Sequence, residues 1–236
     1  MDVLGRVIGV LPWLDWLAVL FFFAAWIGYT QFAKRRADVR PSVLASTNLW
    51  RRQWMLQATL RENRIVDAAV LQTLSSSPSF FASTTILIIG GLLAALGATD
   101  KAGELVRELP FAARTSLLVF DLKVALLTGV FVFAFFRFTW SLRQYTFGAI
   151  LVGAAPDARD LDDAAQRDAF AARAAHVLSL AAEAFTDGLR AYYLAFALVA
   201  WFFSAWAFIA ATALVVWVLY RREFHSEVLE ALREGQ

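Results

Sequence analysis

Three charged residues lie inside long apolar stretches of this chain, where they have the types and spacing to do chemistry. Asp15, Asp121 and Lys123 each occupy the first turns of such a stretch. Ionisable residues in apolar segments of this length pair with one another or line a path for ions. We expect an outer constriction or an interhelical ion pair such as Asp15 with Lys123. The simpler interpretation is a structural clasp or a lysine that snorkels to the interface.

A second group is polar and mostly basic, and it borders the opposite ends of the apolar stretches. Arginine side chains and helix amino-terminal ends attract a small anion or a phospholipid head group, because both offer N–H donors and positive charge. The simpler interpretation is that these arginines follow the positive-inside rule and pair with Asp67, Glu183 or Asp187. The candidate residues are Arg64, Ser77, Arg137, Arg143, Gln144 and Arg190.

Other chemistries have no support in the sequence. The absence of cysteine excludes disulfides, thiolate catalysis and iron-sulfur sites held by thiolates. His176 and His225 are expected on opposite faces, as surface residues and not as haem ligands. The chain carries no phosphate-binding glycine loop, no HExxH motif and no Ser-His-Asp grouping. We therefore expect no enzyme activity, no cofactor, no metal site and no nucleic-acid partner.

Four apolar stretches position these groups. Each is close to the length of about 20 residues that a helix needs to cross a hydrocarbon core of about 30 Å. Hydrophobic residues make up 60% of the chain, and its mean hydropathy is +0.58. The sequence predicts an all-α integral membrane protein, a single membrane domain over 1–236 in the lipid bilayer. The predicted transmembrane helices cover about 11–32, 80–98, 117–136 and 194–219.

The two long connections between these spans are predicted to be helical cytoplasmic extensions, over about 43–74 and 160–193. The first is expected to end at Ser77 and Pro78, which start the next span as its N-cap and first helical residue. In the second, Gly188 interrupts the helical pattern just before the membrane. It is expected to mark a bend or a close helix crossing.

The distribution of basic residues predicts the orientation. Fourteen Lys and Arg residues fall in the two long connections, against seven in the other segments outside the spans. By the positive-inside rule both connections are cytoplasmic, and the N- and C-termini are outside. Arg221 and Arg222 fit this orientation poorly, because they follow the last span on its predicted outer side.

Small residues in the second span suit close helix packing. Gly90 and Ala94 are four residues apart, as are Gly91 and Ala95, so each pair shares a helix face. Small residues at this spacing let helix backbones approach closely. Packing within the chain is favoured slightly over contact with a neighbouring subunit.

Two classes of function fit these features. In the first, a homo-oligomer or a single bundle passes a small ion or solute, and the inner arginines favour anions. In the second, the protein is a non-transporting scaffold or accessory subunit whose cytoplasmic helices bind a protein partner through Trp50, Trp54 and Met55. A continuous polar stripe through several spans would indicate a pore, and the threonines in the spans are too few for one in a single chain.

Four sequence segments carry a resemblance to a known family. They are Phe80 to Thr85, Phe138 to Tyr145, Gly188 to Tyr193 and Leu219 to Phe224. With these motifs the chain resembles family 599 of the domains of unknown function, found in bacteria and plants, from about Arg52 to Phe224. Thr186 departs from the family pattern, which has Asn there. The resemblance implies a four-span membrane protein with no established activity. We expect the protein in a bacterial inner (plasma) membrane.

Overall fold

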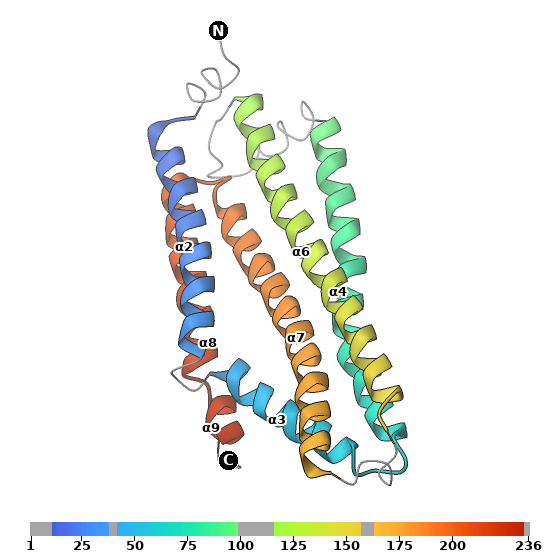
Figure 1. Ribbon diagram of the computed structural model, residues 1–236. Helices are drawn as coiled ribbons and strands as arrows, with labels where there is room; N and C mark the ends of the chain where they lie inside the picture. Colours follow the sequence, from blue (N-terminus) through green and yellow to red (C-terminus); the bar gives the residue numbers. More distant parts are fainter. Residues whose placement is uncertain (1–10, 38–41, 99–115, 157–162, 234–236) are drawn as a thin grey trace. The chain divides into compact units, whose positions relative to one another are not determined.

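The computed structural model describes residues 11–37, 42–98, 116–156 and 163–233, which form helices and turns without a strand (Figure 1). The helices are α2 (Trp13–Ala37), α3 (Val43–Ala58), α4 (Ile65–Gly97), α6 (Leu117–Gly153), α7 (Ala164–Ala200), α8 (Ala205–Phe224) and α9 (Glu227–Arg233). Four helical segments are long and apolar enough to cross a membrane, and they begin at Trp13, Ile65, Leu117 and Ala205. The predicted all-helical membrane class is confirmed.

The chain divides into two compact units. Unit 1 comprises Met1–Lys34, Thr85–Ala134 and Leu189–Arg221, and unit 2 comprises Arg35–Thr84, Phe135–Gly188 and Arg222–Gln236. Helices α4, α6 and α7 each contribute one segment to each unit.

In unit 1, aromatic contacts define the directions of the helices. Phe22 of α2 lies 5.2 Å from Phe208 of α8 between ring centroids, and Phe32 lies 6.1 Å from Tyr220. Residue numbers rise together in these two contacts, so α2 and α8 run parallel. By the same reasoning α6 and α7 run antiparallel, since Phe131 contacts Tyr192 and Phe120 contacts Phe202.

The predicted fourth span is not one helix. Helix α7 ends at Ala200, and α8 begins at Ala205. Ser204 caps α8, because its Oγ accepts the Ala207 N–H at 3.0 Å. Tyr193 packs against Leu219 at the other end of α8, so α7 and α8 form an antiparallel hairpin. The apolar run hid this turn, and Ser204 was the local signal for it.

The first connection is also divided, where one helix was predicted over 43–74. Helix α3 ends at Ala58, and the Thr59 hydroxyl donates to the Leu56 carbonyl at 2.6 Å. Asn63 then starts α4 by accepting the Ile65 N–H at 3.0 Å. Local side-chain bonds therefore end one helix and begin the next.

The predicted helix start at Ser77 and Pro78 is wrong, because α4 is continuous and Pro78 lies inside it. Proline cannot donate to the carbonyl one turn earlier. The hydroxyls of Ser75 and Ser76 bond to the carbonyls of Gln72 and Thr73 within this helix, at 2.9 and 2.7 Å. The serines that suggested a cap therefore lie within a helix.

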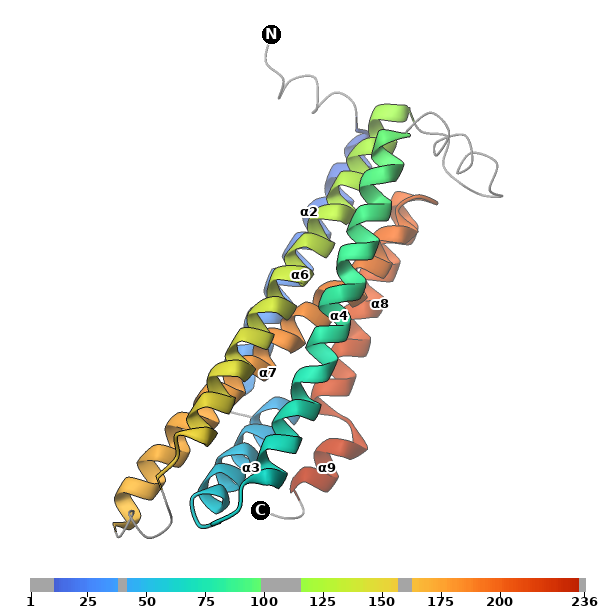
Figure 2. The ribbon, with the colours of Figure 1, turned by 90° about the vertical axis from the view of Figure 1, so that its right-hand side faces the viewer.

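In unit 2, α6 and α7 pack closely, and they lie side by side in both views (Figures 1 and 2). A Cβ atom added to Gly188 would lie 2.5 Å from Phe138, and one added to Gly148 would overlap Leu178. The Ser141 hydroxyl donates to the Ala181 carbonyl at 2.7 Å. The predicted close crossing at Gly188 is confirmed.

Helix α9 packs on α3 within unit 2 (Figure 2). The Trp50 indole N–H donates to the Leu232 carbonyl at 3.0 Å, and the Leu44 N–H donates to Glu223 at 3.2 Å. Met55 lies in the core of the unit, and Trp54 packs against that core. Trp54 and Met55 are therefore not the exposed partner anchors that the sequence suggested.

The small residues of α4 face outward. Gly90, Gly91 and Ala94 are exposed, Ala95 is half-buried, and a Cβ atom on either glycine would meet nothing within 4 Å. The predicted close packing of this face within the chain is wrong for the described residues. The larger aromatic residues, and not these small ones, mediate the contacts of unit 1.

We predict that Gly188→Ala lowers the free energy of unfolding by about 1–3 kcal/mol, because the added methyl group overlaps the buried Phe138 ring. Gly129→Ala is the matched control, since a Cβ atom there meets nothing within 4 Å. Its higher helix propensity should leave stability unchanged or raise it by up to about 1 kcal/mol. Denaturant titration in detergent, followed by far-UV circular dichroism, measures both. Equal stability of the two variants would contradict the close crossing.

Candidate functional site

The six predicted anion-site residues are divided between the two units. Arg64, Ser77, Arg137, Arg143 and Gln144 belong to unit 2, whereas Arg190 belongs to unit 1. Each has surroundings of its own, so their roles must be read separately.

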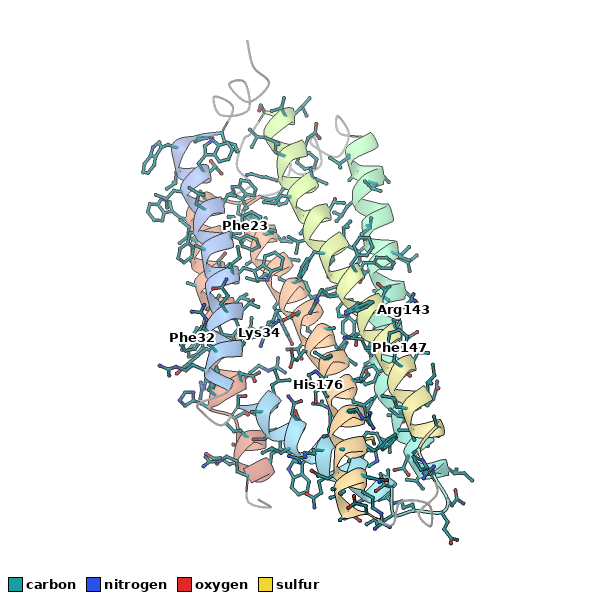
Figure 3. All side chains as sticks on the ribbon, viewed as in Figure 1. Phe23, Phe32, Lys34, Arg143, Phe147 and His176 are labelled. Atoms are coloured by element: carbon teal, nitrogen blue, oxygen red, sulfur yellow. The ribbon has the colours of Figure 1, made fainter. Side chains whose placement is uncertain are left out.

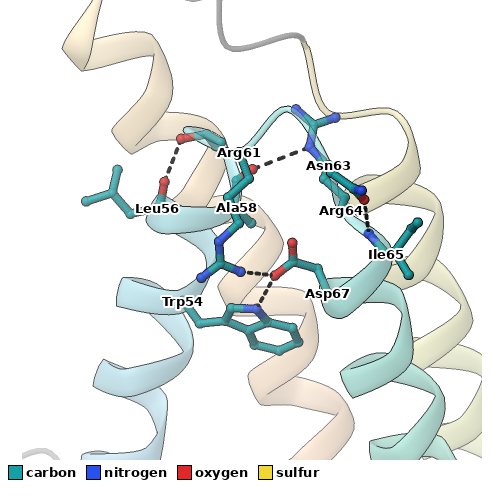
Figure 4. Close-up of polar contacts among 9 residues, drawn as sticks. Trp54, Leu56, Ala58, Arg61, Asn63, Arg64, Ile65 and Asp67 are labelled. Carbon is teal, nitrogen blue, oxygen red and sulfur yellow. Dashed lines mark hydrogen bonds and ion pairs between the residues drawn. The ribbon is translucent and has the colours of Figure 1, made fainter.

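Arg64 joins the ends of two helices of unit 2. Its guanidinium donates to the Ala58 carbonyl at 3.3 Å (Figure 4). It also donates to the carbonyls of Ala155, at 2.6 Å, and Pro156, at 2.5 Å. Basic side chains commonly satisfy carbonyls at helix carboxyl ends in this way. A guanidinium has five N–H donors, and these bonds use three of them. One N–H on each terminal nitrogen has no partner among the described residues and can bind a ligand.

Asp67 lies near Arg64 in the sequence and is fully buried. The sequence suggested that it pairs with Arg64, but it does not. Its Oδ1 accepts the Trp54 indole N–H at 2.7 Å and an Arg61 N–H at 2.6 Å (Figure 4). Its Oδ2 has no hydrogen-bond partner among the described residues. The sequence analysis predicted one continuous helix here and missed the turn that brings Arg61 and Trp54 to Asp67. The contacts of Asp67 could therefore not be predicted.

The other unit 2 candidates differ in exposure and partners. Arg137 forms an ion pair with Asp187 at 2.5 Å, which was one of the predicted pairings. Arg143 is exposed, and its guanidinium lies 5.7 Å from the Phe147 ring centroid (Figure 3). Gln144 is buried, and its Oε1 has no partner within the described ranges. Arg137 and Arg143 are therefore held by protein groups.

The remaining two candidates lie in different settings. Ser77 is exposed on α4 of unit 2. Arg190 of unit 1 is only 4% exposed, and its guanidinium lies 5.5 Å from the Tyr29 ring centroid. The predicted common vestibule stays a prediction.

Two of the three charged residues predicted at the outer ends of the spans, Asp15 and Lys123, meet at the α7–α8 turn. Asp15 accepts a hydrogen bond from the Trp201 indole N–H. Lys123 donates to the Trp201 carbonyl at 2.8 Å, and its ammonium lies 5.1 Å from the indole centroid. Trp201 is thus the shared partner of both residues, and Asp121 is half-buried on α6. This arrangement favours the structural clasp.

A groove between α4 and α6 is the clearest candidate binding site in unit 2. Its volume is about 590 Å³, which lies in the range of small-molecule sites. One part of the lining is polar: Glu62, Arg64, Gln72, Ser75, Tyr145 and Thr146. The rest is small or apolar: Ala68, Leu71, Ala149, Val152 and Gly153. Of the predicted residues, the groove includes Arg64.

A second arginine adds positive potential near the groove wall. Burial lowers the pKa of Arg51, while the nearby Tyr145 and Glu183 act in the opposite direction. A guanidinium stays charged at neutral pH despite such a shift. Arg51 is held by a 2.6 Å hydrogen bond to Asn48, so its charge is fixed beside Tyr145. No group of three or more potential metal ligands occurs among the described residues.

Comparison with known proteins identifies the family. The model of DUF599, described as a protein of unknown function, matches residues 17–228. The chain belongs to the DUF599 family. Searches among curated proteins and among solved structures gave no match. Family membership confirms the predicted resemblance and carries no activity with it.

For this DUF599 protein we predict that Asp67→Asn lowers the free energy of unfolding by about 1–3 kcal/mol. The change weakens two hydrogen bonds to a fully buried group. Asp168→Asn is the control, because Asp168 and Arg52 form an ion pair at 2.9 Å with both side chains more than half exposed. Such pairs contribute about 0–1 kcal/mol. Chemical denaturation monitored by tryptophan fluorescence compares the variants, and equal losses would contradict a structural role for Asp67.

Proposed function

We propose that this DUF599 protein is a non-transporting membrane protein that holds a phospholipid head group in the α4–α6 groove of unit 2. The two remaining N–H donors of Arg64 carry this proposal, because they give the groove a fixed positive group with unused hydrogen-bonding capacity. A phosphate oxygen is a suitable acceptor for a guanidinium. The hydroxyls of Ser75 and Thr146 line the same space.

Glu62 favours a head group that carries a positive charge as well as a phosphate. It lines the groove together with Arg64, so the site offers one negative and one positive side chain. A phosphoethanolamine head group matches both, with its phosphate toward Arg64 and its ammonium toward Glu62. Leu71 and Val152 offer apolar surface for the part of the lipid beyond the phosphate.

Ion passage through a single chain has less support. The large side chains Phe22, Trp201 and Phe208 are fully buried in unit 1. The buried hydroxyls of Thr128 and Thr212 bond to carbonyls of their own helices, at 2.8 Å each. Among the described residues of unit 1, the Thr30 hydroxyl is buried without a hydrogen-bond partner. A packed aromatic interior with a single such hydroxyl supports a structural bundle over a continuous polar path. A path between copies of the chain stays a prediction, as does homo-oligomerisation.

We also propose a revised topology, with the N-terminus outside and the C-terminus in the cytoplasm. The α7–α8 hairpin supports it, because Leu219 returns to the level of Tyr193. With α8 running back, Arg221 and Arg222 join the side of the two long connections. Seventeen Lys and Arg residues then lie on that side and four on the other. The topology predicted from the sequence placed fourteen Lys and Arg residues on one side and seven on the other. The positive-inside rule favours the more uneven distribution of the revised topology.

The test is lipid binding by delipidated full-length protein, measured by native mass spectrometry. We expect phosphatidylethanolamine to bind about tenfold more tightly than phosphatidylglycerol, the effect of one charge pair of about 1.4 kcal/mol. Glu62→Gln should remove this preference. Ala149→Phe fills the groove and should abolish phosphatidylethanolamine binding, while Ala69→Phe, on α4 but outside the lining, should not.

Soluble phosphoethanolamine in the same assay separates a lipid site from a site for a free phosphate compound. Binding of the soluble compound as tightly as the lipid would contradict a membrane-lipid ligand. Equal lipid binding by Ala149→Phe and Ala69→Phe would remove the groove as the site. Chloride or nitrate flux in sealed proteoliposomes would contradict a non-transporting role.

A further inference from the structure

A second groove lies in unit 1, between the parallel helices α2 and α8. Its volume is about 610 Å³, and small residues form its floor. They are Ala24, Ala25 and Gly28 on α2 and Ala213 on α8. A Cβ atom added to Gly28 would meet nothing within 4 Å, so open space lies directly above this position.

Aromatic side chains form the walls of this groove. They include Tyr29 and Phe32 from α2 and Trp217 and Tyr220 from α8. Such a wall of mainly apolar surface on membrane-spanning helices suits a hydrocarbon chain. Phenol and indole groups near helix ends commonly lie at the level of lipid head groups.

Cationic side chains lie against two of these aromatic rings. The exposed Arg221 guanidinium lies 5.7 Å from the Trp217 ring centroid, and the buried Arg190 guanidinium lies 5.5 Å from the Tyr29 ring centroid. Stacking on an aromatic face orients a guanidinium and leaves its edge available for hydrogen bonds. The exposed Arg221 can therefore meet a phosphate at the end of the groove.

The charge at this end of unit 1 is positive. Lys34 follows Phe32 near the end of α2 (Figure 3), and Phe32 contacts Tyr220, the residue before Arg221. Within the described part of unit 1, the acidic residues are Asp15 and Asp121, on the segments of α2 and α6 near the α7–α8 turn. A negatively charged lipid head group therefore complements the positive charge at this end of unit 1.

We infer that the α2–α8 groove holds one acyl chain of an anionic phospholipid, with the lipid phosphate at Arg221. A second copy of the chain suits the groove less well. Two copies in the same membrane orientation would place Arg221 of each at the same depth, where like charges repel. An anionic lipid instead neutralises Arg221 and fills the space above Gly28. This site is independent of the head-group groove in unit 2.

The test is a titration of delipidated full-length protein with phosphatidylglycerol and phosphatidylcholine of identical acyl chains, followed by native mass spectrometry. We expect about tenfold tighter binding of phosphatidylglycerol to the wild type. Gly28→Phe should abolish that binding by filling the groove. Gly91→Phe is the matched control, since Gly91 lies on a membrane-spanning helix and also faces open space. Arg221→Gln should bind both lipids equally.

Ala213→Phe fills the same groove from α8 and gives a second variant should Gly28→Phe fail to fold. Phosphatidylglycerol binding by a folded Gly28→Phe or Ala213→Phe variant at wild-type strength would overturn the inference. The inference would also be overturned if the wild type formed a dimer and either variant were monomeric, because a second copy would then occupy the groove. Retained phosphatidylethanolamine binding in these variants distinguishes this site from the groove in unit 2.

Discussion

The clasp at Trp201 is the interaction on which the arrangement of unit 1 depends. A chain reversal inside an apolar segment exposes backbone carbonyls that lipid cannot satisfy. Lys123 satisfies one of them at Trp201, and Asp15 accepts the indole N–H of the same residue. One tryptophan therefore ties α2, α6 and the α7–α8 turn together. Because the chain turns here, α8 runs back beside α2 and forms the α2–α8 groove.

The sequence predicted the helices better than it predicted where they end. Apolar length identified the membrane class, and Gly188 was expected at a close crossing. The turn at 201–204 was missed because a hydropathy pattern cannot show that Lys123, far away in the sequence, satisfies a carbonyl there. Pro78 and its serines were misread as a helix start because their hydroxyls bond equally well within a helix. Helix ends in this chain depend on tertiary contacts.

The candidate site also depends on tertiary contacts that the sequence does not show. The sequence singled out basic residues near the apolar stretches, but the roles of individual arginines depend on which carbonyls and carboxylates lie opposite. Arg64 reaches two carbonyls at the end of α6, and Arg137 reaches Asp187. The α4–α6 groove depends on the register of two helices that are separated along the chain. No spacing in the sequence determines that register, so residues such as Tyr145 could not be placed in the groove in advance.

The most direct measurement is the membrane side of the C-terminal helix. The chain has no cysteine, so single cysteines can be introduced without background. Ala231→Cys, Ala169→Cys and Ser116→Cys would be tested with a membrane-impermeant maleimide in intact cells and inverted vesicles. If α8 returns as the clasp requires, Ala231 and Ala169 are labelled from one side of the membrane and Ser116 from the other. Labelling of Ala231 from the same side as Ser116 would contradict the hairpin and restore a single fourth span.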